Sequence, residues 1–416
     1  MLLHRYALTF KIFILFSGIY AQVSYTIEEC DKLFQKNNLL LLAQQYNIAS
    51  EKAAVIQARI WEQPYLYVEP MLYNTDHRDV FNVGPDGQKL ISVQQLIYLG
   101  KKRKEILYAK SNVILAELEF EDLLRTLRHE MHKNFYELYF NQVKYNNLEI
   151  LLKNLNDLIQ AHYIQAQKGN IPLKDVVRLQ SLAVSVKKEL MDIHANNLIN
   201  QEQLKLLTGT TENINAIVEE QFVVSMYKKQ IQYSDDELLE LALRNNPDYL
   251  YAKQLRVSME AYLKWQKSLS IPNPTIGAIY DQRSAAFNNQ FSLSLGLPLP
   301  LWNKNKGNIK IAEAKLNQQN LLLQYSQEEL KAKIYNAKQK ILYHQSQASM
   351  IESEFQNLQI VYQGVLDNFQ KRHISLIEFT DFMESYQQSI LYFNELKKQL
   401  VISAETLNYY VSQNVF

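Results

Sequence analysis

Apolar side chains recur every three or four residues along most of this chain. The clearest series runs through Phe120, Leu124, Leu127, Met131, Phe135 and Leu138. This spacing lines one face of an α-helix and therefore predicts helical structure. Four such stretches contain no Gly or Pro, namely 101–168, 173–208, 308–363 and 365–416. An uninterrupted helix of about 65 residues would be about 100 Å long, a length typical of coiled coils and helical barrels.

A period of two residues marks two windows between the helical stretches. In the segment 290–301 apolar residues alternate with small or polar ones, at Phe291, Leu293, Leu295, Leu297, Leu299 and Leu301. This alternation predicts a β-strand with one wholly apolar face. Weaker alternation predicts strands near 64–76, 88–99 and 272–282, of which the second loses its phase at Gln95. Lengths near ten residues suit membrane-spanning strands; the alternative is a pair of amphipathic hairpins packed on a soluble core.

Most of the Gly and Pro residues cluster in these two windows, which lie about 208 residues apart. Setting Tyr25 against Tyr233 also brings Pro64 onto Pro272. The chain is therefore predicted to be an internal duplication, each half running helix, β-hairpin, long helix, turn and helix. The predicted units are a signal peptide at 1–21, a first repeat at 22–209 with its hairpin at about 64–99, a connector at 210–232, and a second repeat at 233–416 with its hairpin at about 272–301.

Composition and charge narrow the class of protein. The chain has 416 residues, and its 44 basic and 43 acidic side chains leave no net field that would attract nucleic acid. Its one cysteine, Cys30, excludes an intrachain disulfide framework. Basic residues around a short apolar run that ends at Ala21 predict an exported protein cleaved after that residue. Charges interrupt every later apolar stretch, so a membrane would have to be crossed by β-strands.

Four strands per chain are too few to close a membrane barrel, because spanning barrels begin at about eight strands and an open edge in lipid is not tolerated. The protomer is therefore expected to form a homotrimer. The expected fold is mainly α with a small transmembrane β part: a trimeric twelve-stranded β-barrel, four strands per protomer, continued by a long α-helical barrel.

Three segments carry a resemblance to a known family, namely 27–38, 206–209 and the run Gly-Leu-Pro-Leu-Pro-Leu-Trp-Asn-Lys-Asn-Lys-Gly-Asn-Ile at 296–309. They resemble the TolC-type outer membrane efflux proteins, and the last segment is similar to the CzcC/CusC-like branch that serves heavy-metal cation pumps. The resemblance implies a passive duct in the outer membrane of a Gram-negative bacterium, with its helical part in the periplasm. It also implies docking through a periplasmic adaptor onto an inner-membrane pump of the resistance-nodulation-division class, without enzymatic activity or a cofactor.

Other functions remain open at this point. A TolC-like duct for drugs or for type I secretion fits the same pattern, because the cargo is selected mostly by the pump. A structural coiled-coil protein of the envelope would explain the helices but not two matched hairpins. A periplasmic adaptor would need a lipoyl-like domain and a glycine-rich barrel, and the sequence has neither.

Each half breaks between two long helices, at 168–175 and at 371–378. Tips of this kind contact the adaptor in the resembled family. The positions that match are Lys168, Gly169, Asn170 and Ile171 in the first tip, and Lys371, Arg372, His373 and Ile374 in the second. Arg372 stands where the family usually has glycine, so the second turn is expected to differ in shape from the first.

The carboxylates that ring the closed aperture in TolC fall by motif on Glu378 and Asp381. These residues are three apart and so share one face of a helix. Three chains would bring six carboxylates together in a pore constriction that favours cations. The alternative is that both are ordinary solvated charges at a helix start, where carboxylates are stabilised by the helix dipole.

Two histidines complete the candidate chemistry. His129 and His132 are spaced three apart on a helix, which suits a soft metal ion, but surface histidines within a long helix are the commoner case, so no metal site is predicted. His77 is expected in an extracellular loop. The sequence contains no nucleophile–base pattern, phosphate-binding loop or dinucleotide motif, so no catalytic residue is predicted.

Overall fold

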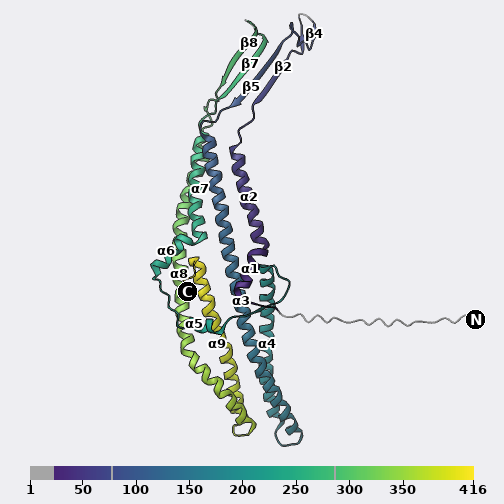
Figure 1. Ribbon diagram of the computed structural model, residues 1–416, viewed down its shortest axis with the longest axis vertical. Helices are drawn as coiled ribbons and strands as arrows, with labels where there is room; N and C mark the ends of the chain where they lie inside the picture. The colour runs from purple at the N-terminus through teal and green to yellow at the C-terminus, as the bar shows by residue number, and fades with distance from the viewer. Residues whose placement is uncertain (1–22, 76–77, 285–286) are drawn as a thin grey trace, which may run out of the picture.

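The computed structural model describes residues 23–75, 78–284 and 287–416. It is an elongated molecule, with a small β-sheet at one end and two helical hairpins at the other (Figure 1). The predicted signal peptide and His77 lie outside the described residues.

Four long helices form the body of the molecule. Helix α3 spans Lys101–Gln167, 67 residues, and α8 spans Lys306–Gln370, 65 residues. Each is followed by a tight turn and a shorter partner of 36 residues, α4 at Leu173–Thr208 and α9 at Leu376–Val411. The long helices predicted from the absence of Gly and Pro are confirmed.

Each half begins with two helices, where the sequence pattern predicted one. They are α1 at Ile27–Asn37 and α2 at Leu39–Arg59 in the first half, and α6 at Asp235–Asn245 and α7 at Pro247–Leu269 in the second.

The break within each pair has a cause in the sequence. Asn38 and Asn246 adopt extended backbone and cap the following helix with their side-chain oxygens. The amide nitrogen of Asn38 donates to Leu207 O (3.0 Å), and that of Asn246 to Tyr410 O (2.8 Å). The internal repeat predicted from the sequence thus extends to equivalent hydrogen bonds of Asn38 and Asn246.

The sheet contains strands β2 (Tyr65–Pro70), β5 (Lys89–Leu96), β7 (Thr275–Arg283) and β8 (Asn288–Gly296), all antiparallel in that order. A two-residue pair, β3 (Tyr73–Asn74) and β4 (Asp79–Val80), extends the first hairpin. The four main strands are shorter than predicted at one or both ends. The alternating run that continues to Leu301 passes beyond the last residue of β8.

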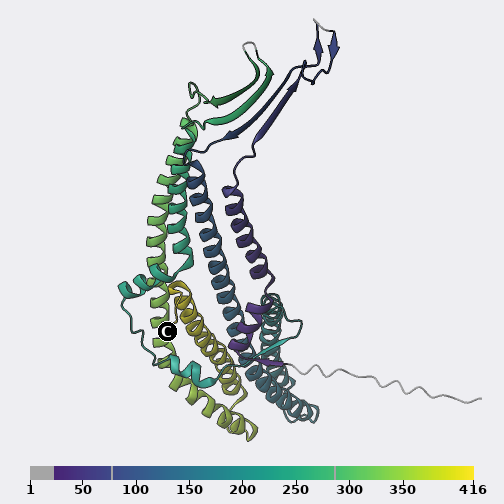
Figure 2. The same ribbon diagram turned by 45° about the horizontal axis from the view of Figure 1, so that its top comes forward.

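The strand register gives the sheet two unlike faces. Leu66, Val93, Ala278 and Leu293 are aligned across it, and so are Val68, Ile91, Tyr280 and Phe291. The opposite face aligns Tyr67, Ser92, Ile279 and Ser292, and the sheet curves (Figure 2). Leu293 is 82% exposed whereas Ser92 is 2% exposed, so the apolar face is turned outward.

The helices form one curved layer below the sheet. Next to the sheet the order is α2, α3, α7, α8, and toward the tips it is α4, α3, α9, α8 (Figure 1). At mid-length, the connector pairs β1 (Val23–Tyr25) with β6 (Ile214–Ala216) in parallel and adds α5 (Glu220–Met226). Within the described residues no helix is both long and apolar enough to cross a membrane.

Candidate functional site

The two helical tips have the same backbone turn. Gly169 N donates to Ala166 O (2.9 Å), and Arg372 N donates to Phe369 O (3.0 Å). One residue later, Asn170 N and His373 N each reach back five residues, to the carbonyls of Gln165 and Asn368. The equivalent positions differ by 203 throughout, so the tips are copies of one structure.

The expectation that Arg372 alters the second turn is wrong. Gly169 has φ +74° and Arg372 has φ +60°, so both are left-handed. A left-handed conformation brings Cβ of an L-residue close to the following carbonyl. The chain accepts this strain at Arg372 because the bonds of the turn hold the backbone on both sides.

Aromatic side chains hold the second tip together from within. Phe369 at the end of α8 stacks on Phe379 in the first turn of α9, with ring centroids 4.0 Å apart. His162 of α3 stacks on the other side of this pair, 5.2 Å from Phe369. The loop is thereby fixed to two buried rings of its own half and to a half-buried ring of the first half. The eight candidate adaptor-contact residues in the two tips remain exposed, apart from Ile171 and Ile374, which are half-buried.

Glu378 is exposed at the start of α9 and takes part in a capping box. Its carboxylate accepts a hydrogen bond from Ser375 N (2.7 Å), and its own backbone N–H donates to Ser375 Oγ (3.2 Å). The Ser375 backbone N–H, and then its side chain, hold the pKa of Glu378 below its ordinary value. Within one chain Glu378 therefore stabilises the helix start.

Asp381 makes a contact between the two halves of the chain. Its carboxylate lies 3.6 Å from the guanidinium of Arg178, which is in α4. Arg178 Nε also donates to Thr380 Oγ1 (3.0 Å). The ion pair is half-exposed, so its contribution is small, within about 1 kcal/mol. It brings a charge predicted for the constriction into contact with the neighbouring hairpin.

The two histidines that were considered as metal ligands, and for which no metal site was predicted, do not converge. His129 stacks on Tyr409, with ring centroids 4.6 Å apart. His132 lies instead between two carboxylates: Nδ1 is 2.8 Å from Glu405 and Nε2 is 3.2 Å from Asp31. Among the described residues, no group of three or more His, Cys, Asp or Glu side chains is arranged to hold a metal ion.

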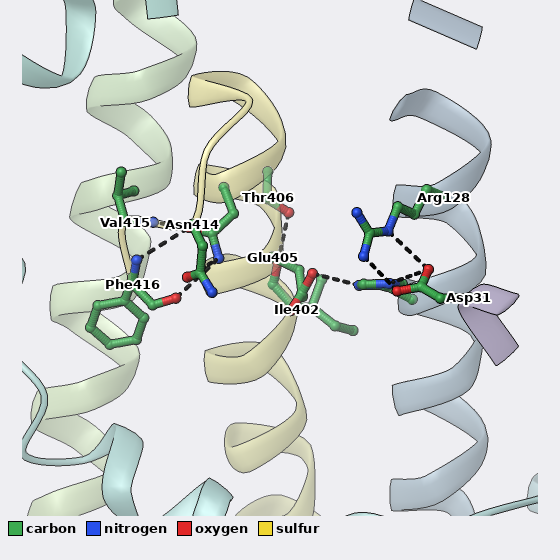
Figure 3. A network of polar contacts seen from close by, with 10 residues as sticks. Asp31, Arg128, Ile402, Glu405, Thr406, Asn414, Val415 and Phe416 are labelled. Carbon is green, nitrogen blue, oxygen red and sulfur yellow. Dashed lines mark hydrogen bonds and ion pairs between the residues drawn. The ribbon is translucent and has the colours of Figure 1, made fainter. Parts of the chain in front are cut away.

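This polar network joins three helices at mid-length and was not foreseen from the sequence. Figure 3 shows Asp31 of α1 between the guanidinium of Arg128 on α3 and the imidazole that bridges to Glu405 on α9. Burial lowers the pKa of His132, but hydrogen bonds to Asp31 and Glu405 outweigh it and raise the pKa to about 9. Burial lowers the pKa of His129 to about 4. Of these two histidines, His132 is therefore charged at neutral pH and His129 is neutral.

Comparisons with known proteins identify the fold. No protein-family model matches the sequence, and no curated protein matches it. The chain is similar to the crystal structure of CusC, with a TM-score of 0.75 and 14% identity over 92% of this chain and 91% of that one.

Two outer membrane channels superpose equally well. The CmeC channel of Campylobacter jejuni gives a TM-score of 0.77 at 12% identity, over 93% of this chain and 86% of that one. The open-state MtrE channel of Neisseria gonorrhoeae gives 0.70 at 12% identity, over 94% and 89%. In each of the three comparisons the superposition covers more than nine tenths of this chain. The chain described here therefore has the fold of outer membrane channels.

Proposed function

We propose that this protein is the outer membrane channel of a tripartite efflux system, through which substrates pass without chemical change. The observation that carries the proposal is the outward apolar face aligned across all four strands at one end of the molecule. Apolar side chains exposed in such a band are favoured only in contact with hydrocarbon or another protein. The duct would place the sheet in the outer membrane and the helices in the periplasm.

Both ends of the sheet and both ends of the helix layer support assembly of three copies. Strands β2 and β8 are the two edges of the sheet. Helix α2, which precedes β2, lies with α4 at one edge of the helix layer, and α8, which follows β8, lies at the other edge. A strand edge cannot stay unpaired in lipid. Joining β8 of one copy to β2 of the next closes a ring, and three copies give twelve strands.

The test of this proposal is assembly and conductance. The full chain, extracted from outer membranes in detergent, should have a protein mass three times that of one copy, and the trimer should open conducting pores in planar bilayers. A stable folded monomer in detergent, or a trimer that does not conduct under any voltage or after opening variants, would refute the channel function.

The tips are the proposed contact with the periplasmic adaptor and, through it, with an inner-membrane pump of the resistance-nodulation-division class. Their exposure at the end of the molecule remote from the sheet favours this. Glu378 and Asp381 are the proposed constriction, supported by their exposed side chains on one face of α9. The Arg178–Asp381 pair is a contact that would have to change when the aperture opens.

The constriction is tested with charge-neutralising variants that keep the cap. Glutamine also completes a capping box, so Glu378→Gln removes the charge without removing the hydrogen bonds. We expect Glu378→Gln with Asp381→Asn to reduce block by divalent cations added from the tip side and to lower cation selectivity in planar bilayers. The matched control is Glu354→Gln with Glu212→Gln, both exposed and remote from the tips. Unchanged block and selectivity would place the constriction elsewhere.

Heavy-metal cations are the proposed cargo, on the strength of the 296–309 segment and its likeness to the CzcC/CusC-like branch. Deletion of the gene should then sensitise the host to copper, silver, zinc or cobalt ions and leave its tolerance to drugs unchanged. Sensitivity to drugs alone, or loss of a secreted protein, would assign the channel to drug efflux or type I secretion instead.

A further inference from the structure

Basic side chains are concentrated where the helices meet the sheet. Ten of them lie in the two helical turns nearest the sheet or in the connections to the strands, against two acidic residues, Glu62 and Glu105, although the whole chain carries a net charge of only +1. We call these ten residues the basic collar: Arg59, Lys101, Lys102, Arg103, Lys104, Lys264, Lys267, Lys304, Lys306 and Lys310. They come from the ends of α2, α3, α7 and α8 next to the sheet (Figure 2).

Acidic residues in and next to this zone neutralise only part of the collar. Lys102 pairs with Glu105 at 3.1 Å, Lys264 with Glu260 at 2.9 Å, and Lys267 with Glu313 at 3.1 Å. Among the described residues, no carboxylate lies within 4.0 Å of the other basic groups of the collar. Arg103, Lys304, Lys306 and Lys310 are also exposed, so four unpaired charges per chain face the surroundings.

The charge at the first turns of α3 and α8 is the reverse of what helix starts favour. Helices α1, α6 and α9 each begin with a capping box and with an acidic residue in the first turn. Helices α3 and α8 have no side-chain cap and no acidic residue in the first turn. Cations there oppose the positive end of the helix dipole. An external anion would remove this repulsion.

The surroundings of the collar identify the kind of anion. All three tryptophans of the chain, Trp61, Trp265 and Trp302, lie at this level. Trp302 is 92% exposed and follows the exposed Leu297, Leu299 and Leu301, which extend the apolar face of the sheet. Tryptophan gathers where hydrocarbon gives way to lipid headgroups. The unpaired charges therefore sit next to a band of the kind that marks the headgroup layer.

We propose that the basic collar binds the phosphate headgroups of anionic phospholipids in the membrane leaflet that faces the helical end. The proposal rests on the proposed membrane position of the sheet. Each bound headgroup supplies the negative charge that the first turns of α3 and α8 lack. The collar thereby sets how deeply the sheet sits in the bilayer, because the charged side chains cannot follow the apolar face into hydrocarbon.

The experiment titrates the full-length trimer in neutral detergent with fluorescent phosphatidylglycerol, and in parallel with phosphatidylcholine. The test variant combines Arg103→Gln, Lys304→Gln, Lys306→Gln and Lys310→Gln. The matched control combines Lys153→Gln, Lys187→Gln, Lys331→Gln and Lys340→Gln, four exposed basic residues remote from the sheet. We expect phosphatidylglycerol to bind the test variant about tenfold more weakly or worse, with phosphatidylcholine binding unchanged and the control like the wild type.

Equal phosphatidylglycerol affinity in the test variant and the wild type overturns the proposal, as does an equal loss in the control. Displacement of the lipid by millimolar inorganic phosphate would show a free-anion site and also overturns it. If the test variant does not assemble, two measurements on assembled protein replace it. The affinity of the wild type for phosphatidylglycerol must fall as the salt concentration rises. A variant with Lys304→Arg, Lys306→Arg and Lys310→Arg must bind phosphatidylglycerol as tightly as the wild type, and failure of either result overturns the proposal. Assembly and conductance of the wild type are measured first, so failure of the channel function is recognised separately.

Discussion

At the scale of single residues, His132 joins the two halves of the chain through its side chain. Its side chain is 13% exposed and is bonded to Asp31 from the first half and Glu405 from the second. Its folded pKa of about 9 lies above the ordinary value of 6.5. The protonated form is therefore favoured by folding, and its stabilisation is complete below about pH 6.5 and lost as the pH rises through about 9.

We expect this charge to contribute about 3 kcal/mol at neutral pH, from a difference of roughly two to three pKa units. The thermal unfolding midpoint should fall between pH 7 and pH 10 in the wild type, and this fall should be reduced in His132→Gln. His194→Gln, in which the replaced side chain is exposed, is the control and should follow the wild type. A pH profile in His132→Gln that matches the wild type would show that the imidazole is not charged in the folded protein.

Arg372 and Gly169 form a matched pair of left-handed residues. A Cβ added to Gly169 would have no atom within 4 Å, so only the backbone conformation is at issue. We expect Arg372→Gly to raise the free energy of unfolding by about 1 kcal/mol and Gly169→Ala to lower it by a similar amount. Thermal unfolding of both variants checks this, and a destabilised Arg372→Gly would mean that the arginine side chain has a partner in the assembly.

Residue-level chemistry was the part least accessible from the sequence. Asp31, His132 and Glu405 are separated by about 100 and 270 positions, and no local pattern relates them. The capping boxes were within reach, since Ser375 and Glu378 have the expected spacing. For Glu378 the sequence left two readings open, a pore constriction and a charge at a helix start. The capping box shows the helix-start role within one chain, and the constriction stays a prediction.

At the scale of elements, the strand register decides which side chains would meet lipid in the proposed channel. Leu293 aligns with Ala278 on the outer face, whereas Ser294 aligns with Gly277 on the inner face. A Cβ at Gly277 would come 2.7 Å from Ser294 Oγ and 2.8 Å from Val93 O, so the inner face is too crowded there for a larger residue. Glycine allows the curved strands to approach closely.

The two faces should respond differently to a charge. Leu293→Arg places a guanidinium against hydrocarbon and should cost roughly 2–4 kcal/mol at the bilayer midplane, whereas Ser294→Arg can extend into the lumen. Heat-modifiable gel migration after outer membrane extraction measures insertion. Equal loss of inserted protein in both variants would mean that the register or the lipid face is wrongly assigned.

Elements were predicted well where one period dominates, as in the four long helices. The first strand pair was harder, because Gln95 falls on the apolar face, where its side-chain amide donates to the backbone carbonyls of Glu62 and Leu96. Because these hydrogen bonds satisfy the amide of Gln95, a polar residue can occupy the apolar face there. The alternation of apolar and polar residues is broken, but the strand continues. The helix pair of the first half was missed because Asn38 interrupts the helix without a Gly or Pro. In the second half Pro247, the first residue of α7, is a sequence signal for the break that could have been used.

At the scale of the whole molecule, both edges of the helix layer expose apolar side chains that a solitary chain would leave in water. On α8, Leu321 is 67% exposed and Ile360 is 74% exposed. On the other edge, Leu39 of α2 is 77% and Met191 of α4 is 72% exposed. These surfaces match the proposed contact between copies, which the sequence predicted only through the need to close the sheet.

Leu321→Glu with Ile360→Glu should therefore weaken the trimer and leave the fold of one chain intact. Each buried side chain lost from a contact between copies corresponds to about 1.5–3 kcal/mol. Mass measurement in detergent as the protein is diluted checks this, with Gln318→Glu and Gln359→Glu, exposed on the same helix, as the control. Trimers of equal stability in both variants would place the contact elsewhere.

The duplicated halves have a consequence for how the proposed ring of three copies can change in evolution. Each half contributes two main strands and a pair of helices across the layer, so six half-length chains would close the same ring as three full ones. Fusion into one chain leaves the ring size unchanged but frees the two copies to diverge. The divergence is visible in two places. Among the described residues the β3–β4 extension belongs to the first hairpin alone, and tip turns with the same hydrogen bonds present Gly169 in one half and Arg372 in the other. In the proposed ring of three copies, a partner that binds the tips would meet one backbone shape repeated six times and two side-chain chemistries in alternation.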